Sequence, residues 1–126
     1  MEIPSDLRYT ADHEWAKEDQ GRVRVGLTDF AQDALGDIVF VDLPAVGSEV
    51  AQGGPLGEVE STKSVSQVYA PVSGRVVEVN EALRDAPEDL NAEPYAKGWL
   101  CVIEPSERAQ FDDLLDAAGY RDLTEA

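Results

Sequence analysis

The sequence contains very few of the residues that form disulfides and transition-metal sites. Of its 126 residues one is cysteine, Cys101, and one is histidine, His13. A lone cysteine cannot form an internal disulfide, and this pair cannot supply the usual set of zinc ligands. A carboxylate-only site for Ca²⁺ or Mg²⁺ stays open on residue counts, but no EF-hand spacing is present. Cys101 lies in an apolar run, which favours a small buried side chain over a reactive thiol.

Basic residues are also scarce, and long apolar runs are missing. Ten lysines and arginines face 26 acidic residues, giving a net charge of −16. Such a field repels phosphates and anionic lipid, so we expect no nucleic-acid or membrane partner. The acidity favours solubility or docking onto basic faces of partner proteins. No run is long enough to span a bilayer, and no secretory signal is visible, so the simplest expectation is a cytoplasmic, bacterial protein.

The length suits one domain over residues 1–126, with its core within residues 8–104. Short alternating runs broken by glycine and proline predict a mainly β fold of the sandwich or barrel type. Thr28 is a suitable N-cap for a short helix over residues 28–35, which would end at Gly36. The acidic stretch from residue 84 to 94 predicts a long loop. A C-terminal helix is predicted over residues 106–118, because apolar side chains recur there at helical spacing and Gly119 follows. These side chains are Phe111, Leu114, Leu115 and Ala118.

A weak internal repeat is visible in the β-like part of the chain. Residues 36–42 resemble residues 74–80, an offset of 38, and residues 56–60 resemble residues 100–104, an offset of 44. Two similar β units predict two sheets related by a pseudo-twofold axis. The turn that contains Lys63 would then join the two halves and project from one end of the molecule.

Lys63 is one of only three lysines, with Lys17 and Lys97, and it lies between two predicted strands. Small hydroxyl residues flank it: Ser61, Thr62 and Ser64. An exposed amine on a rigid turn suits covalent modification, because the modifying enzyme meets the same geometry each time. Glu60 adds a negative charge that favours the ammonium form. Position alone favours the alternative, an ordinary surface lysine on a turn. The scarcity of lysine, the hydroxyl residues on both sides and the central place in the repeat favour a modification site.

Several segments, in this order and spacing, closely resemble the lipoyl-carrying H proteins of the glycine cleavage system. The resemblance covers nearly the whole chain. The segments are YTADHEW at 9–15, GLTDFAQ at 26–32, LGDIVFVDLP at 35–44, GEVESTKS at 57–64, APVSG at 70–74, PY at 94–95 and GWL at 98–100.

The resemblance implies that Lys63 carries lipoic acid through an amide bond. It implies a barrel-sandwich hybrid of the lipoyl-domain type, with two antiparallel sheets and helices near both termini. A carrier of this family has no catalysis of its own and is expected to be a monomer when free. Its partners would be a pyridoxal-phosphate glycine decarboxylase (P protein), a tetrahydrofolate-dependent aminomethyltransferase (T protein), dihydrolipoamide dehydrogenase (L protein) and a lipoate-attaching enzyme.

The resemblance also implies that the segment around His13 lines a cleft where the loaded arm is sheltered from water. Glu14 would pair there with the aminomethyl ammonium, with Asp12 and Gln67 as neighbours. Gln67 departs from the family, which often has an acidic residue at this position. The alternative is a plain strand start, in which Trp15 packs in the core and His13 is satisfied locally.

Other carriers fit the residues around Lys63 less well. Biotin carriers usually place methionine on both sides of the lysine, whereas the only methionine here is Met1. Lipoyl domains of 2-oxoacid dehydrogenases usually have aspartate before the lysine and occur in longer chains. An enzyme in its own right is disfavoured, since no nucleophile–base pair, phosphate loop or metal cluster is visible in the sequence.

Overall fold

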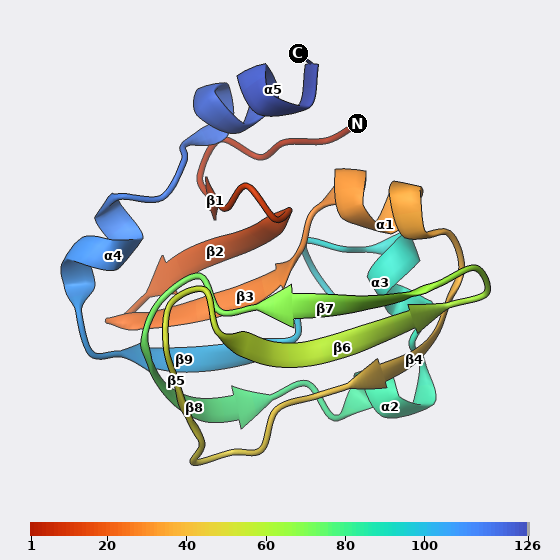
Figure 1. Ribbon diagram of the computed structural model, residues 1–126, viewed down its shortest axis with the longest axis horizontal. Coiled ribbons are helices and arrows are strands. Elements are labelled where there is room, and N and C mark those ends of the chain that lie inside the picture. The colour runs from red at the N-terminus through yellow and green to blue at the C-terminus, as the bar shows by residue number, and fades with distance from the viewer. Residues whose placement is uncertain (126) are drawn as a thin grey trace.

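Two antiparallel sheets form the protein in a computed structural model, which we describe over residues 1–125 (Figure 1). The larger sheet has six strands in the order β1-β2-β3-β9-β8-β5, and the smaller has three in the order β4-β6-β7. The six are β1 (Arg8–Tyr9), β2 (Glu14–Asp19), β3 (Arg22–Leu27), β9 (Cys101–Pro105), β8 (Gly74–Val79) and β5 (Glu49–Val50). The three are β4 (Ile38–Asp42), β6 (Pro55–Ser61) and β7 (Val65–Tyr69). The predicted mainly β fold of two antiparallel sheets is confirmed.

The core lies between the two sheets, because alternate residues of each strand point inward. Val23 and Val25 of β3 are fully buried, as are Val59 of β6 and Ile103 of β9. These side chains belong to one cluster to which both sheets contribute. Cys101 is also fully buried, and burial raises the pKa of its thiol to about 12, so it is a packing residue as expected.

The internal repeat appears as two equivalent strand pairs, β4 with β6 and β8 with β9. Each pair has a bulge at the same place, between Ile38 and Phe40 and between Val76 and Glu78. The predicted offset of 38 therefore holds. The second predicted offset, 44, is wrong, because the strand pairing gives 42. Ile38 pairs with Ser61 as Val76 pairs with Ile103, and Val41 pairs with Val59 as Val79 pairs with Cys101, so β6 matches β9 at an offset of 42.

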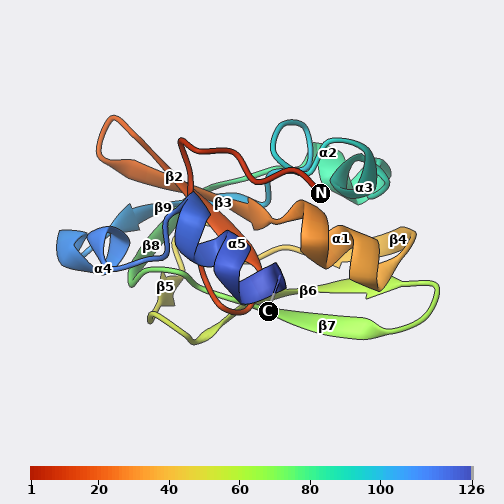
Figure 2. The ribbon, with the colours of Figure 1, turned by 90° about the horizontal axis from the view of Figure 1, so that it is seen from above.

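The first helix follows the sequence expectation closely. Helix α1 runs from Asp29 to Leu35, and the Thr28 hydroxyl accepts a hydrogen bond from Ala31 N at 3.2 Å. Gly36 ends the helix with φ +82°, a conformation that a Cβ atom disfavours. This short helix connects the larger sheet to the smaller one (Figure 2).

The predicted loop over residues 84–94 instead contains two single-turn helices, α2 (Ala82–Asp85) and α3 (Asp89–Ala92). Each one buries a leucine completely, Leu83 in α2 and Leu90 in α3. Helices of four residues are too short to leave a helical period in the sequence, so the prediction was wrong about this segment.

A C-terminal helix is present, but the structure divides the predicted segment into α4 (Arg108–Asp112) and α5 (Ala117–Glu125). Between them Leu115 is extended and pairs with Tyr9 through two backbone hydrogen bonds of 2.8 and 2.9 Å. Asp116 then caps α5, because its side chain accepts from Gly119 N at 2.8 Å. Gly119 therefore lies inside a helix rather than ending one, and Ala118 is exposed.

A second apolar cluster joins the two ends of the chain. Its buried members are Leu7, Tyr9, Trp15 and Tyr120, the last from α5. The Tyr9 and Tyr120 rings stack with their centres 4.6 Å apart. In Figure 1 the N-terminal segment and α5 accordingly lie together at the top of the molecule.

Candidate functional site

Lys63 lies at the far tip of the β6–β7 hairpin, in a turn built around one buried hydroxyl (Figure 1). The Ser61 Oγ accepts from the backbone N–H groups of Lys63 and Ser64, both at 3.1 Å, and donates to Ser64 O at 3.2 Å. Ser61 N also donates to Ser64 O at 2.8 Å. Ser61 is buried, whereas Lys63 and its neighbours Thr62 and Ser64 are exposed. One serine side chain therefore orders the turn that presents the lysine.

The Lys63 side chain passes over Gly36 at the end of α1. A Cβ atom added to Gly36 would lie 3.1 Å from Cε of Lys63 and 3.6 Å from Nζ. The side chain of Asn91 holds residues 36–38, which lie next to the lysine stem. It donates to Gly36 O at 2.8 Å and accepts from Ile38 N at 2.9 Å. Glu60, expected to lie near the ammonium, makes no ion pair with Lys63 among residues 1–125.

A groove of about 150 Å³ opens between α1 and β7 near this turn. Its walls are Asp12 and His13, apolar side chains of β3 and α1, and Ser66 and Gln67 of β7. Gln67 follows Lys63 by four residues, so at about 3.3 Å per residue the groove lies within about 13 Å of the lysine along the strand. The apolar members are Leu27, Phe30, Ala31, Ala34 and Leu35.

The structure brings three of the predicted cleft residues, Asp12, His13 and Gln67, to this groove. The fourth, Glu14, lines a neighbouring hollow of about 320 Å³ together with Tyr69, and Asp12 borders both hollows. Gln67 is engaged in the sheet, where its amide donates to Gly57 O at 2.6 Å. The predicted set is therefore divided between two adjoining hollows.

Glu14 is a buried carboxyl group with two hydrogen bonds, and it forms no salt bridge within the described residues 1–125. Its carboxylate accepts from the Thr10 hydroxyl at 2.6 Å and from Tyr69 N at 3.2 Å. Only 1 % of the residue is exposed, and burial raises the pKa of Glu14 to about 7, against the lowering effect of these two hydrogen bonds. The carboxyl group therefore titrates near neutral pH.

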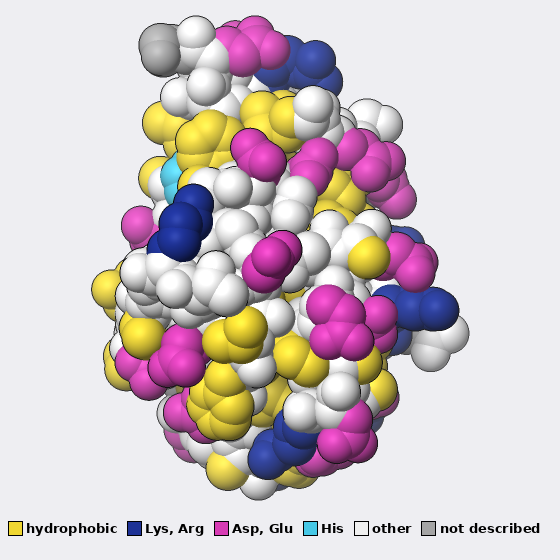
Figure 3. All heavy atoms as spheres, turned by 90° about the vertical axis from the view of Figure 1, so that its right-hand side faces the viewer, with side chains coloured by type: hydrophobic (Ala, Val, Ile, Leu, Met, Phe, Trp, Pro, Cys, Tyr) yellow, Lys and Arg dark blue, Asp and Glu magenta, His cyan; other side chains and the backbone are white. Residues whose placement is uncertain are grey.

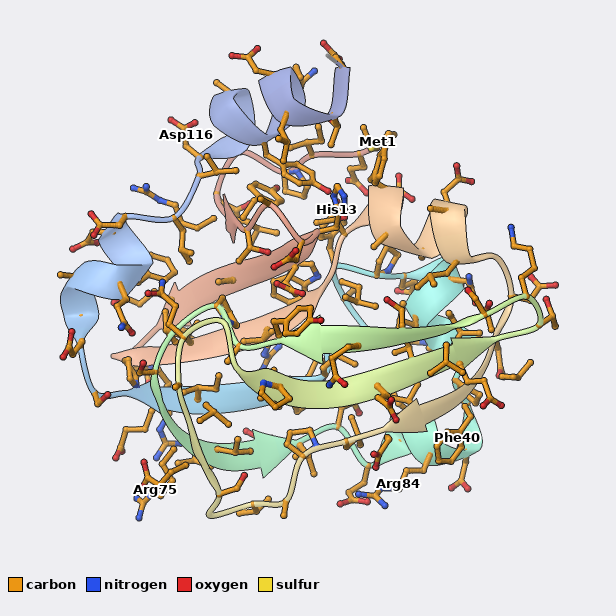
Figure 4. The ribbon with its side chains drawn as sticks, in the orientation of Figure 1. Met1, His13, Phe40, Arg75, Arg84 and Asp116 are labelled. Carbon is orange, nitrogen blue, oxygen red and sulfur yellow. The ribbon has the colours of Figure 1, made fainter. Side chains whose placement is uncertain are left out.

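His13 is held by residues that sequence reasoning did not connect to it. Its Nδ1 lies 2.8 Å from the Tyr120 hydroxyl, and its ring stacks on that of Phe30 with the ring centres 4.5 Å apart. Figure 4 shows His13 below the C-terminal helix and beside α1. Its φ of 71° is unusual for a residue other than glycine and costs roughly 1–2 kcal/mol. Burial lowers its pKa. Tyr120 lies beyond Gly119, the expected end of the C-terminal helix, so the sequence carries no signal of this contact.

Exposed apolar side chains lie beside the hairpin. Phe40 and Val65, 57 % and 58 % exposed, are both aligned with Glu60, which pairs with each of them across the smaller sheet. The bulge in β4 leaves Val39 exposed next to Phe40. On the face seen in Figure 3, hydrophobic side chains gather in the lower half among acidic ones. This combination suits docking to other proteins.

Residues 1–125 offer neither a cluster of metal-binding side chains nor a helix able to cross a membrane. No group of three or more histidine, cysteine or acidic side chains is arranged there to hold a metal ion. In the same part of the chain, no helix has both the length and the hydropathy needed to cross a bilayer.

Comparison with known proteins gives a consistent result. The sequence model of the glycine cleavage H-protein family matches residues 7–126. A glycine cleavage system H protein of Oceanobacillus iheyensis is 54 % identical over 120 residues, covering 95 % of each chain. One from Bacillus subtilis is 51 % identical over 125 residues, covering 99 % of this chain and 98 % of its own. The crystal structure of such a protein from Mycobacterium marinum superposes with a TM-score of 0.91 at 46 % identity, covering 98 % of this chain and 100 % of that one.

Proposed function

Because the chain belongs to the glycine cleavage H-protein family, a carrier component of the glycine cleavage system, we propose that Lys63 carries a covalently attached lipoyl group. The observation that carries this proposal is the turn itself. Its backbone is fixed by Ser61, while the lysine amine extends past Gly36 into solvent. An exposed amine on a rigid support is what a modifying enzyme needs to recognise. In this proposal Glu60, Ser61, Thr62 and Ser64 form the attachment motif.

The residues near Lys63 fit a tethered arm of this kind. The arm supplies a dithiolane that exchanges electrons and a carried group, and this chain supplies recognition, reach and shelter. The groove beside α1 gives an apolar wall and a polar rim, so it can cover an apolar arm and exclude water. Asp12, which borders both hollows, provides negative charge that suits an aminomethyl ammonium, with His13 and Gln67 beside it. Glu14 adds charge from the adjoining hollow once its carboxyl group, with a pKa of about 7, is ionised.

In this function the protein is a non-catalytic shuttle among three enzymes. It takes the aminomethyl group from the pyridoxal-phosphate glycine decarboxylase to the tetrahydrofolate-dependent aminomethyltransferase, and it takes the dihydrolipoyl arm to dihydrolipoamide dehydrogenase. A tether raises the effective concentration of the arm at each docked active site. Net charge −16 and the exposed Phe40 and Val65 support docking to basic, partly apolar surfaces near each active site and on the lipoate-attaching enzyme. We place the protein in the bacterial cytoplasm, as a monomer when free.

The test is to identify the modified residue and then the activity that depends on it. The protein is produced in cells supplied with lipoate, its intact mass is measured, and the modified peptide is mapped. We expect one lipoyl group on wild type, on Lys17→Arg and on Lys97→Arg, and none on Lys63→Arg. With the three partner enzymes, only Lys63→Arg should fail to support glycine breakdown. A biotinyl adduct, an adduct on another lysine, or full activity of Lys63→Arg would overturn the proposal.

A further inference from the structure

The C-terminal helix α5 contacts His13, a residue that lines the groove, through the side chain of Tyr120. The residue is fully buried, and its hydroxyl lies 2.8 Å from Nδ1 of His13 and 2.7 Å from Oγ1 of Thr28. These three side chains come from the loop before β2, the N-cap of α1, and α5. A single hydroxyl therefore links the C-terminal helix to the histidine that lines the groove.

The direction of the hydrogen bonds follows from Thr28. Its Oγ1 accepts from Ala31 N at 3.2 Å, and Thr28 is fully buried, so its hydroxyl hydrogen needs an acceptor within the protein. Among the described residues Tyr120 Oη is the acceptor within hydrogen-bond distance. Thr28 therefore donates to Tyr120, and Tyr120 donates to Nδ1 of His13. The opposite direction would leave the buried hydrogen of Thr28 without an acceptor, which is costly.

This chain of donors determines which nitrogen His13 offers to a ligand. Since Nδ1 accepts from Tyr120, the neutral ring carries its proton on Nε2. The ring is also held by stacking on Phe30 and by its edge contact with the Tyr120 ring at 5.8 Å. With Nδ1 occupied, Nε2–H is the polar group of the ring left for the groove, and it suits an acceptor atom of the arm.

We propose that Tyr120 is a positioning residue that fixes the ring orientation and the tautomer of His13. Through Tyr120, α5 would then determine which hydrogen-bonding group His13 presents to the groove between α1 and β7. The positioning of His13 stands on the geometry alone. Its effect on the arm rests on the proposed function, because only a modified Lys63 would place an arm in this groove. The two parts can therefore be tested separately.

The first test measures the ring nitrogens of the unmodified full-length protein by ¹⁵N NMR. The chain has one histidine, so the resonances need no assignment among rings. The variant is Tyr120→Phe, and the matched control is Tyr95→Phe. Tyr95→Phe also removes two hydrogen bonds, because the Tyr95 hydroxyl accepts from Asp29 N at 3.0 Å and donates to Glu2 O at 2.6 Å. Neither bond involves His13. Urea unfolding of each variant shows that both are compared in the folded state.

We expect wild type to carry its proton on Nε2, with the Nδ1 resonance displaced by an accepted hydrogen bond. Tyr120→Phe should move the Nδ1 resonance toward that of free imidazole, and Tyr95→Phe should leave it in place. A wild-type proton on Nδ1, or an Nδ1 resonance that does not move in Tyr120→Phe, would overturn the proposal.

The second test uses lipoylated protein whose attachment at Lys63 has been verified by mass. The arm is reduced, and its alkylation by iodoacetamide is timed. Cys101 is fully buried, so the arm is the thiol that reacts. Because Tyr120→Phe loses the hydrogen bond that positions His13, its arm should be alkylated about fivefold faster than that of wild type, whereas the rate for Tyr95→Phe should change little. Equal rates in the two variants would reject the role of Tyr120 at the groove, while the attachment itself would stand on the mass measurement.

Discussion

Gly36 supports two features at once, the end of α1 and the path of the Lys63 side chain. Its φ of +82° with ψ of −158° is a region that only glycine occupies readily. Replacing it with alanine should cost roughly 1–3 kcal/mol of stability through backbone strain. The new methyl group would also lie 3.1 Å from Cε of Lys63, which is close enough to displace the lysine stem. Gly36→Ala should therefore affect both stability and modification.

Gly21→Ala is the matched control. Gly21 also has a left-handed φ of +80°, but a Cβ atom there has nothing within 4 Å. Both variants are unfolded in urea. With a slope of about 1–3 kcal/mol per molar, a loss of this size should lower the midpoint of Gly36→Ala by about 1 M.

Lipoylation is then followed by intact mass at a temperature where all proteins are folded. We expect slower modification of Gly36→Ala than of wild type, while Gly21→Ala keeps the wild-type rate despite its own loss of stability. The reasoning would be refuted by equal modification rates for Gly36→Ala and Gly21→Ala. That result would mean that the lysine adjusts freely and that its contact with Gly36 has no role in presenting the amine.

Three further substitutions probe the Lys63 turn, the buried carboxyl group of Glu14 and the hydrogen bonds from Asn80 to residues 97 and 99. Ser61→Ala removes the acceptor of two turn amides and should slow lipoylation while costing about 1 kcal/mol, whereas Thr62→Ala, an exposed neighbour, should do neither in the same assays. Burial raises the pKa of Glu14 from 4.5 to about 7, so its contribution to stability is present below pH 4.5 and is lost as the pH rises toward 7. Urea curves should accordingly show Glu14→Gln gaining stability relative to wild type between pH 4.5 and 7, and a constant difference over that interval would contradict this. Asn80→Ala leaves Lys97 O and Trp99 O without their donor at 2.8 Å and should cost about 2 kcal/mol in thermal or urea unfolding.

Local sequence signals were sufficient for the parts of the fold that depend on neighbours in the chain. The first helix was predictable because its cap, Thr28, and its terminator, Gly36, act within one helical turn. The strand pairs were visible as a repeat because inward-facing residues alternate. The second offset was wrong by two residues, since similarity of sequence does not fix the register of pairing, which here follows from the shared bulge.

In the C-terminal region, local sequence signals did not predict the division of the helix. The spacing of Phe111, Leu114 and Leu115 is helical, yet the side chains serve two different clusters. Phe111 and Leu114 pack on the main core, while Leu115 packs with Tyr9 and pairs with its backbone. One straight helix cannot satisfy both clusters, so the chain extends at Leu115 and a new helix starts after Asp116. This requirement is tertiary, and no local pattern contains it.

The candidate site was likewise predictable only in part from the sequence. Lys63 and its hydroxyl neighbours were evident because scarcity and small flanking residues are properties of the sequence itself. The groove was not evident in full, because it depends on contacts across more than a hundred residues, such as His13 with Tyr120. Glu14 was placed with Gln67 on the basis of resemblance, but strand alternation directs the buried Glu14 into the hollow beside Tyr69.

The arrangement separates two requirements of a carrier. The amine must be exposed and uniform in geometry, and the turn meets this need with the hydrogen bonds of Ser61 and with the contact between the Lys63 stem and Gly36. In the proposed function the arm also needs a selective resting place, and the groove that would provide it is built by distant segments: β7, α1 and the loop before β2, with α5 acting through Tyr120. Substitutions in the turn should therefore change how fast the lysine is modified, whereas substitutions at Tyr120 should change how the arm is sheltered without changing modification. A variant of Tyr120 that blocked lipoylation while remaining folded would show that the two requirements are not separate.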